Sequence, residues 1–141
     1  RSVSSAASDV YKRQDENKNR VVFESEDIEF LIDPNDFSMI IRNLLRNACN
    51  YSELDKEINV NLFKDKSSIV LSVVDKGRGI ATSDHERVFE RFYRVDKGRS
   101  RSLGGTGIGL SIVKHAVDRN GGLIELDSVL GSGTTFTIKF E

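Results

Sequence analysis

The clearest apolar pattern in the chain predicts an amphipathic helix over residues 35–50. Its apolar positions recur at i, i+3, i+4 and i+7, and they are Phe37, Ile40, Ile41, Leu44, Leu45 and Ala48. Asn35 or Asp36 would cap the start of this helix. At about 100° per residue, Asn43, Asn47 and Asn50 gather on one edge of the apolar stripe. A solvated face is more often built from Glu and Lys, so the asparagines favour a functional groove over that plainer interpretation.

Shorter apolar runs predict β-strands on both sides of the helix. The predicted strands cover residues 21–23, 28–32, 58–62, 69–74, 123–128 and 134–140. The first two read as a β-hairpin across an acidic turn, the middle two as antiparallel neighbours, and the last two as another hairpin. Thr134 shares a face with apolar residues of its strand, so its hydroxyl should be buried and need a partner, which a ligand or an ordered water could supply.

A glycine-rich run, Gly104-Gly105-Thr106-Gly107-Ile108-Gly109, leads directly into a second helical pattern of Leu110, Val113 and Val117. Glycines followed by a helix N-terminus let backbone N–H groups approach an anion, so the run predicts a polyphosphate cradle. A flexible linker is the plainer alternative. The P-loop pattern fails because Leu110 stands where lysine is required, and a dinucleotide fingerprint would need glycine there. Asn120-Gly121-Gly122 predicts a left-handed end to this helix.

Two further stretches carry candidate chemistry. Asp75-Lys76-Gly77-Arg78-Gly79-Ile80 places an acid at a strand end, and its second glycine points to close ligand approach, although an ordinary Asp-Gly turn is possible. Ser83 and Glu86 have capping-box spacing for a short helix that would end near 89–94. Residues 95–103 are basic without apolar periodicity, which suggests either a mobile lid beside the cradle or a solvated loop.

Length and composition allow one domain. The chain has 141 residues, is 38% hydrophobic and 30% charged, and carries a net charge of −1, which gives no whole-chain attraction to nucleic acid or membrane. Residues 1–14 are rich in Ser and Ala without periodicity, so we treat 1–19 as a non-native or linker-like segment and 20–141 as the domain. No apolar run is long enough to span a bilayer. Cys49 alone cannot form an internal disulfide and is expected to be a small helix residue without chemistry.

Five motifs, in order, resemble the catalytic ATP-binding domain of bacterial sensor histidine kinases. They are Asn43-x-x-x-Asn47-Ala48, Asp75-x-Gly77-x-Gly79, Phe89-x-x-Phe92-Tyr93-Arg94, Gly105-x-Gly107-x-Gly109-Leu110 and Gly133-Thr134-x-Phe136. The resemblance covers about residues 20–141 and implies the Bergerat ATP-binding fold. This is an α+β fold, a two-layer sandwich in which a mixed, mostly antiparallel sheet carries its helices on one face.

The resemblance also implies roles for single residues. Asn47 would coordinate Mg²⁺ with assistance from the catalytic residue Asn43, and Arg94 would stabilise charge on the γ-phosphate. Asp75 would accept from the adenine amine, helped by Thr134 through water, and Tyr51 would stack on the base. The further ATP-binding positions would be Gly77, Gly79, Ile80, Phe92, Gly105, Thr106, Gly107, Ile108, Gly109 and Leu110. Phe89 and Phe92 would anchor the lid.

Two departures from the family pattern shape the expected function. Asn50 stands where many relatives carry a phosphate-contacting lysine, and His85 and His115 lie outside any dimerisation-helix setting, so both are expected to be ordinary surface histidines. The hydrolytic relatives have a glutamate at the position of Asn43, and its absence favours phosphoryl transfer over hydrolysis.

The expected enzyme is a protein histidine kinase. It would transfer phosphoryl from MgATP to a histidine on a dimerisation domain that this chain lacks, and from there to a response regulator. The alternatives are a degenerate adenine-nucleotide sensor and a serine kinase of the same superfamily, which the Phe-Tyr-Arg motif disfavours. We expect a cytoplasmic monomer that binds no nucleic acid, with a membrane-anchored parent.

Overall fold

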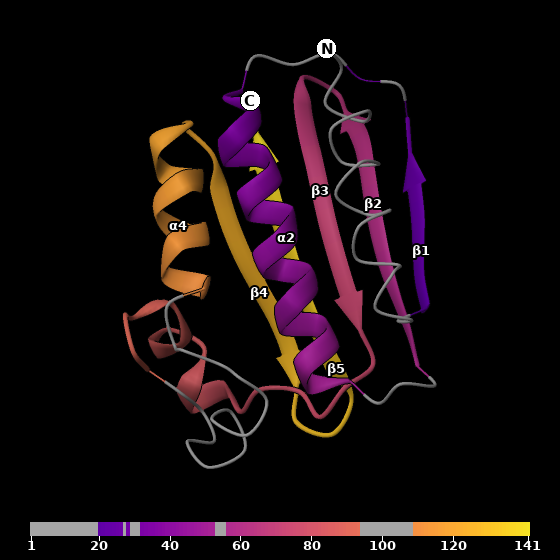
Figure 1. Cartoon of the computed structure of the whole chain (residues 1–141), viewed down its shortest axis with the longest axis vertical. Coiled ribbons are helices and arrows are strands. Elements are labelled where there is room, and N and C mark those ends of the chain that lie inside the picture. The colour runs from indigo at the N-terminus through magenta and orange to yellow at the C-terminus, as the bar shows by residue number, and fades with distance from the viewer. Residues whose placement is uncertain (1–19, 27, 29–31, 53–55, 94–108) are drawn as a thin grey trace.

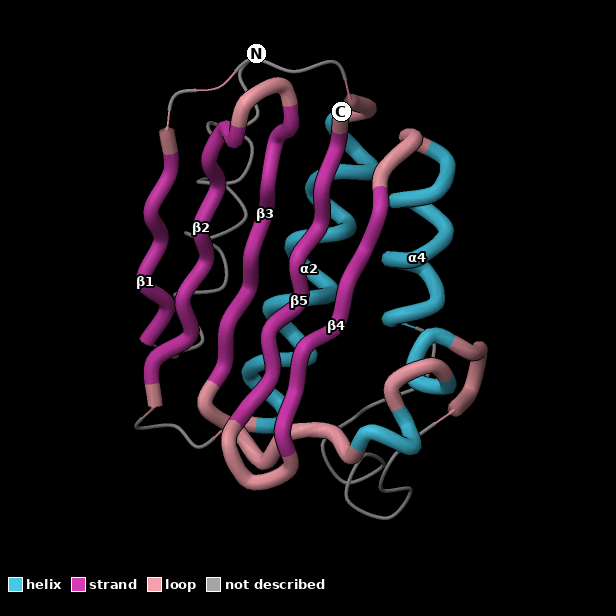
Figure 2. Tube along the Cα trace, turned by 180° about the vertical axis from the view of Figure 1, so that it is seen from behind, coloured by secondary structure: helices cyan, strands magenta, loops and turns pink. Residues whose placement is uncertain are grey.

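A five-stranded mixed sheet forms one layer of the molecule. The computed structural model describes residues 20–26, 28, 32–52, 56–93 and 109–141. The strands are β1 (Arg20–Ser25), β2 (Glu57–Asp65), β3 (Ser68–Asp75), β4 (Leu123–Val129) and β5 (Gly133–Phe140), in the spatial order β1-β2-β3-β5-β4. Figure 2 shows the strands side by side in this order. β1 pairs with β2 in parallel, and the other three pairings are antiparallel.

Among the described residues, two α-helices form the second layer. Helices α2 (Pro34–Tyr51) and α4 (Gly109–Arg119) lie on the same face of the sheet (Figure 1). Two short 3₁₀ turns, η1 (Thr82–Asp84) and η2 (Arg87–Phe89), follow β3. The predicted fold class, an α+β sandwich with a mostly antiparallel sheet and its helices on one face, is confirmed.

The core lies between these two layers. All six apolar positions predicted for the first helix are buried on α2, which confirms the spacing argument. The helix packs on alternate positions of the sheet, and Ile58, Val60, Leu62, Leu71, Phe136 and Ile138 are each at most 2% exposed. Removing this much apolar surface from water supplies the main drive to fold. The same alternation turns the intervening strand residues away from the helices.

Two capping predictions are wrong. The first helix is capped by Asp33, whose carboxylate accepts from the backbone N–H groups of Asn35 at 2.8 Å and Asp36 at 3.1 Å. Proline has no N–H and suits the first helical position, so the cap precedes Pro34. Ser83 and Glu86 form no capping box, because this segment makes two 3₁₀ turns without a side-chain cap. His85 consequently closes η1 rather than starting a helix.

The other boundaries largely follow the pattern. Both antiparallel pairings, β2 with β3 and β4 with β5, are confirmed. The strand at 21–23 lies within β1, whereas most of its predicted hairpin partner, 28–32, falls on 29–31, outside the described residues. The left-handed end of α4 is confirmed by Gly121, with φ +71°, and by the bond from Gly122 N–H to the Val117 carbonyl at 2.9 Å.

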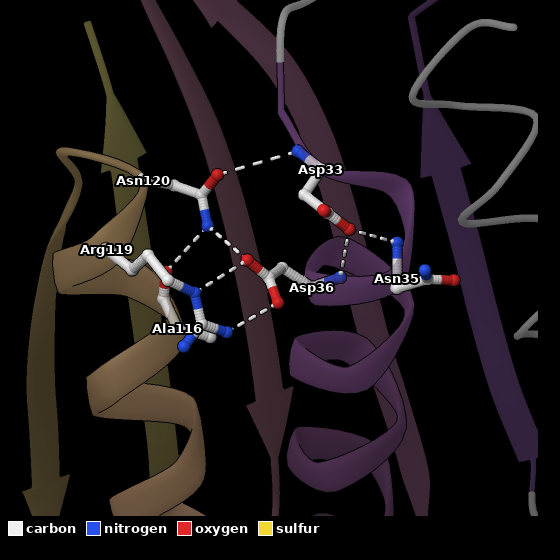
Figure 3. Close-up of polar contacts among 6 residues, drawn as sticks. All are labelled: Asp33, Asn35, Asp36, Ala116, Arg119 and Asn120. Atoms are coloured by element: carbon white, nitrogen blue, oxygen red, sulfur yellow. Dashed lines mark hydrogen bonds and ion pairs between the residues drawn. The ribbon is translucent and has the colours of Figure 1, made fainter.

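A polar cluster joins the start of α2 to the end of α4 (Figure 3). The Arg119 guanidinium donates to both oxygens of Asp36, at 2.6 and 3.1 Å, and the Asn120 amide donates to Asp36 at 2.9 Å and to the Ala116 carbonyl at 2.8 Å. The Asn120 amide oxygen also accepts from Asp33 N–H at 3.5 Å. These bonds hold the pKa of Asp36 below its ordinary value, chiefly through Arg119. We call Asp33, Asp36, Arg119 and Asn120 the interhelical clamp, because their bonds join the two helices.

Candidate nucleotide site

Three buried polar side chains gather where β3 and β4 end and β5 begins. Asp75 and Thr134 are each 5% exposed, and Ser128 is 8% exposed. Sheet register places Thr134 opposite Asp75 on one side and opposite Ser128 on the other. The three polar groups therefore share one edge of the sheet, beside the C-terminal end of α2.

Asp75 is a carboxylate held in a largely dry position. Burial raises the pKa of the Asp75 carboxyl above its ordinary value of 3.8, while hydrogen bonds from the backbone N–H groups of Gly77 and Thr134 oppose that shift. The Gly77 bond measures 2.9 Å. Burial outweighs the two bonds, so a further donor at this carboxylate would be stabilising.

Ser128 is the centre of a hydrogen-bond network that the sequence interpretation missed. Its Oγ lies 2.7 Å from the backbone nitrogen of Ile80, 2.7 Å from the Gly133 carbonyl oxygen and 2.9 Å from Thr134 Oγ1. The buried Thr134 hydroxyl thus has a protein partner, where the sequence suggested ligand or water. A serine inside a predicted strand gives a weak signal, because its neighbours depend on tertiary pairing.

Three glycines of the site are explained by close backbone packing. A Cβ on Gly77 would lie 2.1 Å from the Tyr51 carbonyl oxygen, and one on Gly79 would lie 2.2 Å from that of Val129. A Cβ on Gly133 would lie 2.2 Å from the Asp75 carbonyl oxygen. Gly79 and Gly133 also have positive φ, +74° and +101°. The close approach predicted at Gly79 is thus made to protein backbone, and contact of these glycines with ATP stays a prediction.

Asn43, on the asparagine edge of α2, lies next to the start of α4. Asn43, Asn47 and Asn50 are all partly buried. The Asn43 amide donates to the Met39 carbonyl at 2.8 Å, and its Oδ1 lies 3.2 Å from where a Cβ on Gly109 would stand. A Cβ at residue 109 would be in tight contact with Asn43, so that side chain would have to shift by a few tenths of an ångström to accept one.

Tyr51, the last residue of α2, lies beside the Asp75 loop. The Arg78 guanidinium lies 4.5 Å from the centroid of the Tyr51 ring. The Arg78 backbone N–H also donates to the Tyr51 carbonyl at 3.4 Å. The predicted stacking of Tyr51 on a base therefore concerns a ring that already has a cation over one face.

The aromatic motif lies partly in the core. Phe89 packs edge to face on Phe136, with ring centroids 6.2 Å apart, whereas Phe92 is 63% exposed and has φ +66°. The Tyr93 hydroxyl donates to the Asp84 carboxylate, and this bond is the main reason that the pKa of Tyr93 is raised. Phe89 is therefore fixed to the domain, and the anchoring role of Phe92 stays a prediction.

The remaining predicted site residues divide between described and undescribed positions. Leu110 packs on the core and Ile80 donates to Ser128. Arg94, Gly105, Thr106, Gly107 and Ile108 lie outside the described residues. His85 lies 2.9 Å from the Ile80 carbonyl oxygen through Nε2, and His115 is exposed. Within the described ranges, no three His, Cys, Asp or Glu side chains group to hold a metal, and no helix is long and apolar enough to cross a membrane.

The comparisons with known proteins identify the family. Residues 32–141 match the model of the histidine kinase-, DNA gyrase B-, and HSP90-like ATPases. The chain belongs to this ATPase family. Members are ATP-binding domains, so the buried polar groups at Asp75, Ser128 and Thr134 lie within a nucleotide-binding fold.

Related sequences and structures within this family are named as sensor histidine kinases. The chain is 50% identical over 98 residues to the sensor-like histidine kinase SenX3 of Mycolicibacterium smegmatis, covering 70% of the chain and 26% of SenX3. It is 42% identical over 113 residues to the sensor histidine kinase WalK of Bacillus subtilis, covering 79% of the chain and 18% of WalK. The chain thus spans about a quarter or less of the length of these relatives. The solved structure of the mycobacterial sensor histidine kinase MprB shares the fold, with a TM-score of 0.86, 24% identity and coverage of 99% and 94% of the two chains.

Proposed function

We propose that this histidine kinase-like ATPase domain transfers the γ-phosphoryl group of MgATP to a histidine on a dimerisation domain outside this chain. The observation that carries the proposal is Asp75, a carboxylate 5% exposed at the end of β3. Burial there disfavours its charge, and an amine of a bound base would offset that cost. The relatives that share this stretch are named as sensor histidine kinases, which favours kinase over hydrolase chemistry.

Adenine fits this carboxylate better than guanine does. Its exocyclic amine can donate to Asp75, while guanine presents an oxygen at that position, which a carboxylate repels. Thr134, opposite Asp75 in the sheet register, would take part through a bridging water. Tyr51 would stack on the base.

The phosphates would lie between the asparagine edge and the start of α4. The chemistry of the donor set suits a magnesium nucleotide, because Asn43 and Asn47 both carry amide oxygens, which are hard ligands. Asn43 Oδ1 lies 3.2 Å from the position that a Cβ on Gly109 would take, at the start of α4. Asn47 would offer Mg²⁺ an amide oxygen and Asn43 would assist. The ion, when bound, neutralises phosphate charge. The glycines at 105, 107 and 109 would supply backbone N–H donors.

Arg94 would donate to γ-phosphate oxygens as charge concentrates there during transfer. The acceptor histidine and the downstream response regulator would lie on other segments or proteins, because neither His85 nor His115 has the expected setting. The domain itself would be monomeric and cytoplasmic, as part of a longer membrane-anchored kinase.

Transfer can be tested directly with a separately supplied dimerisation domain of the same kinase. In a single-turnover assay with labelled ATP, the wild type should label that domain and not itself, and Arg94→Ala should slow transfer more than it weakens ATP binding. ATP should bind more tightly than GTP by calorimetry. Self-labelling on His85 or His115, or ATP binding without transfer to the acceptor, would replace the kinase proposal with the nucleotide-sensor alternative.

A further inference from the structure

The hydrogens around Ser128 can be assigned from the chemistry of its three partners. The Ile80 backbone nitrogen lies 2.7 Å from Ser128 Oγ and can only donate. The Gly133 carbonyl oxygen also lies 2.7 Å away and can only accept. A serine hydroxyl has one hydrogen and two lone pairs, so Ser128 gives its hydrogen to Gly133 and accepts from Ile80.

One lone pair of Ser128 then remains, and it fixes the direction of the last bond. Thr134 Oγ1 lies 2.9 Å from Ser128 Oγ. Since the Ser128 hydrogen is already used, the hydroxyl of Thr134 must be the donor in this contact. Thr134 is left with lone pairs alone, and any further group that approaches its oxygen has to be a donor.

We propose that Ser128 is a positioning residue that makes Thr134 an obligate hydrogen-bond acceptor and so sharpens the preference of the site for a base with an exocyclic amine. This inference rests on the proposed adenine site. With Thr134 and Asp75 paired across β3 and β5, the strand ends present two acceptors. A base amine, or a water that it orients, can donate to them, whereas a guanine oxygen meets acceptors on both residues.

Without Ser128 the hydroxyl of Thr134 would be free to turn. Its hydrogen could then point at a guanine oxygen, so discrimination between the bases should weaken even where the fold is intact. Ser128→Ala also leaves Ile80 N–H and the Gly133 carbonyl without this partner, which can lower affinity for both nucleotides together. The ratio of the two affinities is therefore the informative quantity.

The test compares dissociation constants of MgATP and MgGTP for the intact chain. Ser128→Ala should narrow the ATP-over-GTP preference by about three- to tenfold, the effect of about one hydrogen bond. Ser128→Thr keeps the hydroxyl and should retain the wild-type ratio. Ser72→Ala is a matched control, because Ser72 pairs with Thr137 along β3 and away from the strand end, and it should also leave the ratio unchanged.

A double-mutant cycle with Thr134→Val separates positioning from general damage. In the Thr134→Val background, Ser128→Ala should change both affinities alike and leave their ratio fixed. If Ser128→Ala does not fold, Thr134→Val alone must narrow the ratio, since Ser128 keeps its other two partners there. If the wild type prefers ATP and Ser128→Ala leaves the ATP-over-GTP ratio unchanged, the proposed role of Ser128 is wrong while the adenine site stands. A wild type that binds no ATP, or binds both nucleotides equally, overturns the adenine site and this inference with it.

Discussion

At the scale of single residues, two carboxylates of this domain have opposite pKa shifts because their surroundings differ. Burial dominates at Asp75 and raises its pKa, while the charged and polar donors Arg119 and Asn120 dominate at Asp36 and lower it. Their charges therefore have opposite effects on folding. Ionisation of Asp36 stabilises the folded state relative to the unfolded state. Ionisation of Asp75 destabilises it, because the buried carboxyl is more stable when protonated.

The Asp75 shift predicts a pH dependence of stability. Between its ordinary pKa of 3.8 and its raised pKa in the folded state, the native chain binds more protons at this site than the unfolded chain. The stability that protonated Asp75 contributes is therefore complete below about pH 3.8 and is lost as the pH rises through the pKa of the folded state. Urea unfolding of wild type and Asp75→Asn over this range should show wild type losing stability relative to the variant as pH increases. A difference in unfolding free energy that stays constant with pH, or that grows in favour of the wild type, would contradict the raised pKa of Asp75.

Asn47→Ala tests whether that asparagine serves the ligand or the fold. Asn47 is only partly buried and lies beside the apolar stripe, so its loss should weaken Mg²⁺-dependent ATP binding by about tenfold or more and leave stability nearly unchanged. Leu44 on the same helix is 1% exposed, and Leu44→Ala should cost about 2–5 kcal/mol of unfolding free energy. Calorimetric titration and urea unfolding measure the two effects, and a stability loss at Asn47 equal to that at Leu44 would make Asn47 structural.

At the scale of elements, the interhelical clamp sets how α4 lies against α2. It joins the first turn of α2 to the last turn of α4 (Figure 3). The other ends of the same helices carry Asn47 and Gly109. The clamp holds one end of the helix pair together, and the packing of the two helices on the sheet must set their separation at the end that carries the proposed phosphate site.

Asp36→Asn should therefore lower stability at neutral pH, because the Arg119 bonds lose their ionised acceptor. The pKa of Asp36 is lowered in the folded state. The stability that ionised Asp36 contributes is therefore present above pH 3.8 and is lost as the pH falls through the folded-state pKa. Asp118→Asn is the matched control, since Asp118 pairs with Lys114 at 2.9 Å on the exposed face of α4 and should change stability little. Thermal melts at neutral and strongly acidic pH measure both variants. Equal shifts for the two, or an Asp36→Asn effect that persists at the acidic pH, would argue against the clamp.

Periodicity was sufficient to predict the main elements but not their local ends. The apolar stripe from Phe37 to Ala48 and the alternation in β2 each report directly which face is buried, so helix and strand were predicted correctly. Caps depend on one or two local bonds, and Pro34 moved the helix start to Asp33. The turns after β3 contain too few residues for a periodic signal.

The candidate site was only partly visible in the sequence for a related reason. Asp75 and the asparagine edge carry their own polar signal at positions where apolar or charged surface residues are usual. Ser128 carries none, because its partners lie in two other segments, Ile80 after β3 and Gly133 and Thr134 at the start of β5, which meet it only when β3, β5 and β4 are paired. The parallel partner of β1 was likewise invisible, since nothing in a short apolar run specifies which distant strand it will join.

At the scale of the whole molecule, the order of strands in the sheet determines at what stage of folding the base site can form. β5 lies between β3 and β4, and its pairing with β3 brings Asp75 and Thr134 together. The sheet cannot be completed from neighbouring segments alone, because β3 and β5 are separated in the chain by η1, η2, α4 and β4.

This placement of β5 makes a nucleotide a reporter of complete folding. A partly folded chain in which β2 and β3 have formed their hairpin but β5 is still detached would have no paired Asp75 and Thr134, and hence no base site. A ligand that binds only the finished sheet stabilises it by mass action. It should therefore slow hydrogen exchange of those amides that open only in global unfolding, and leave local fraying at exposed turns unaffected. The strand that completes the core would thus also make ligand binding and folding one cooperative event.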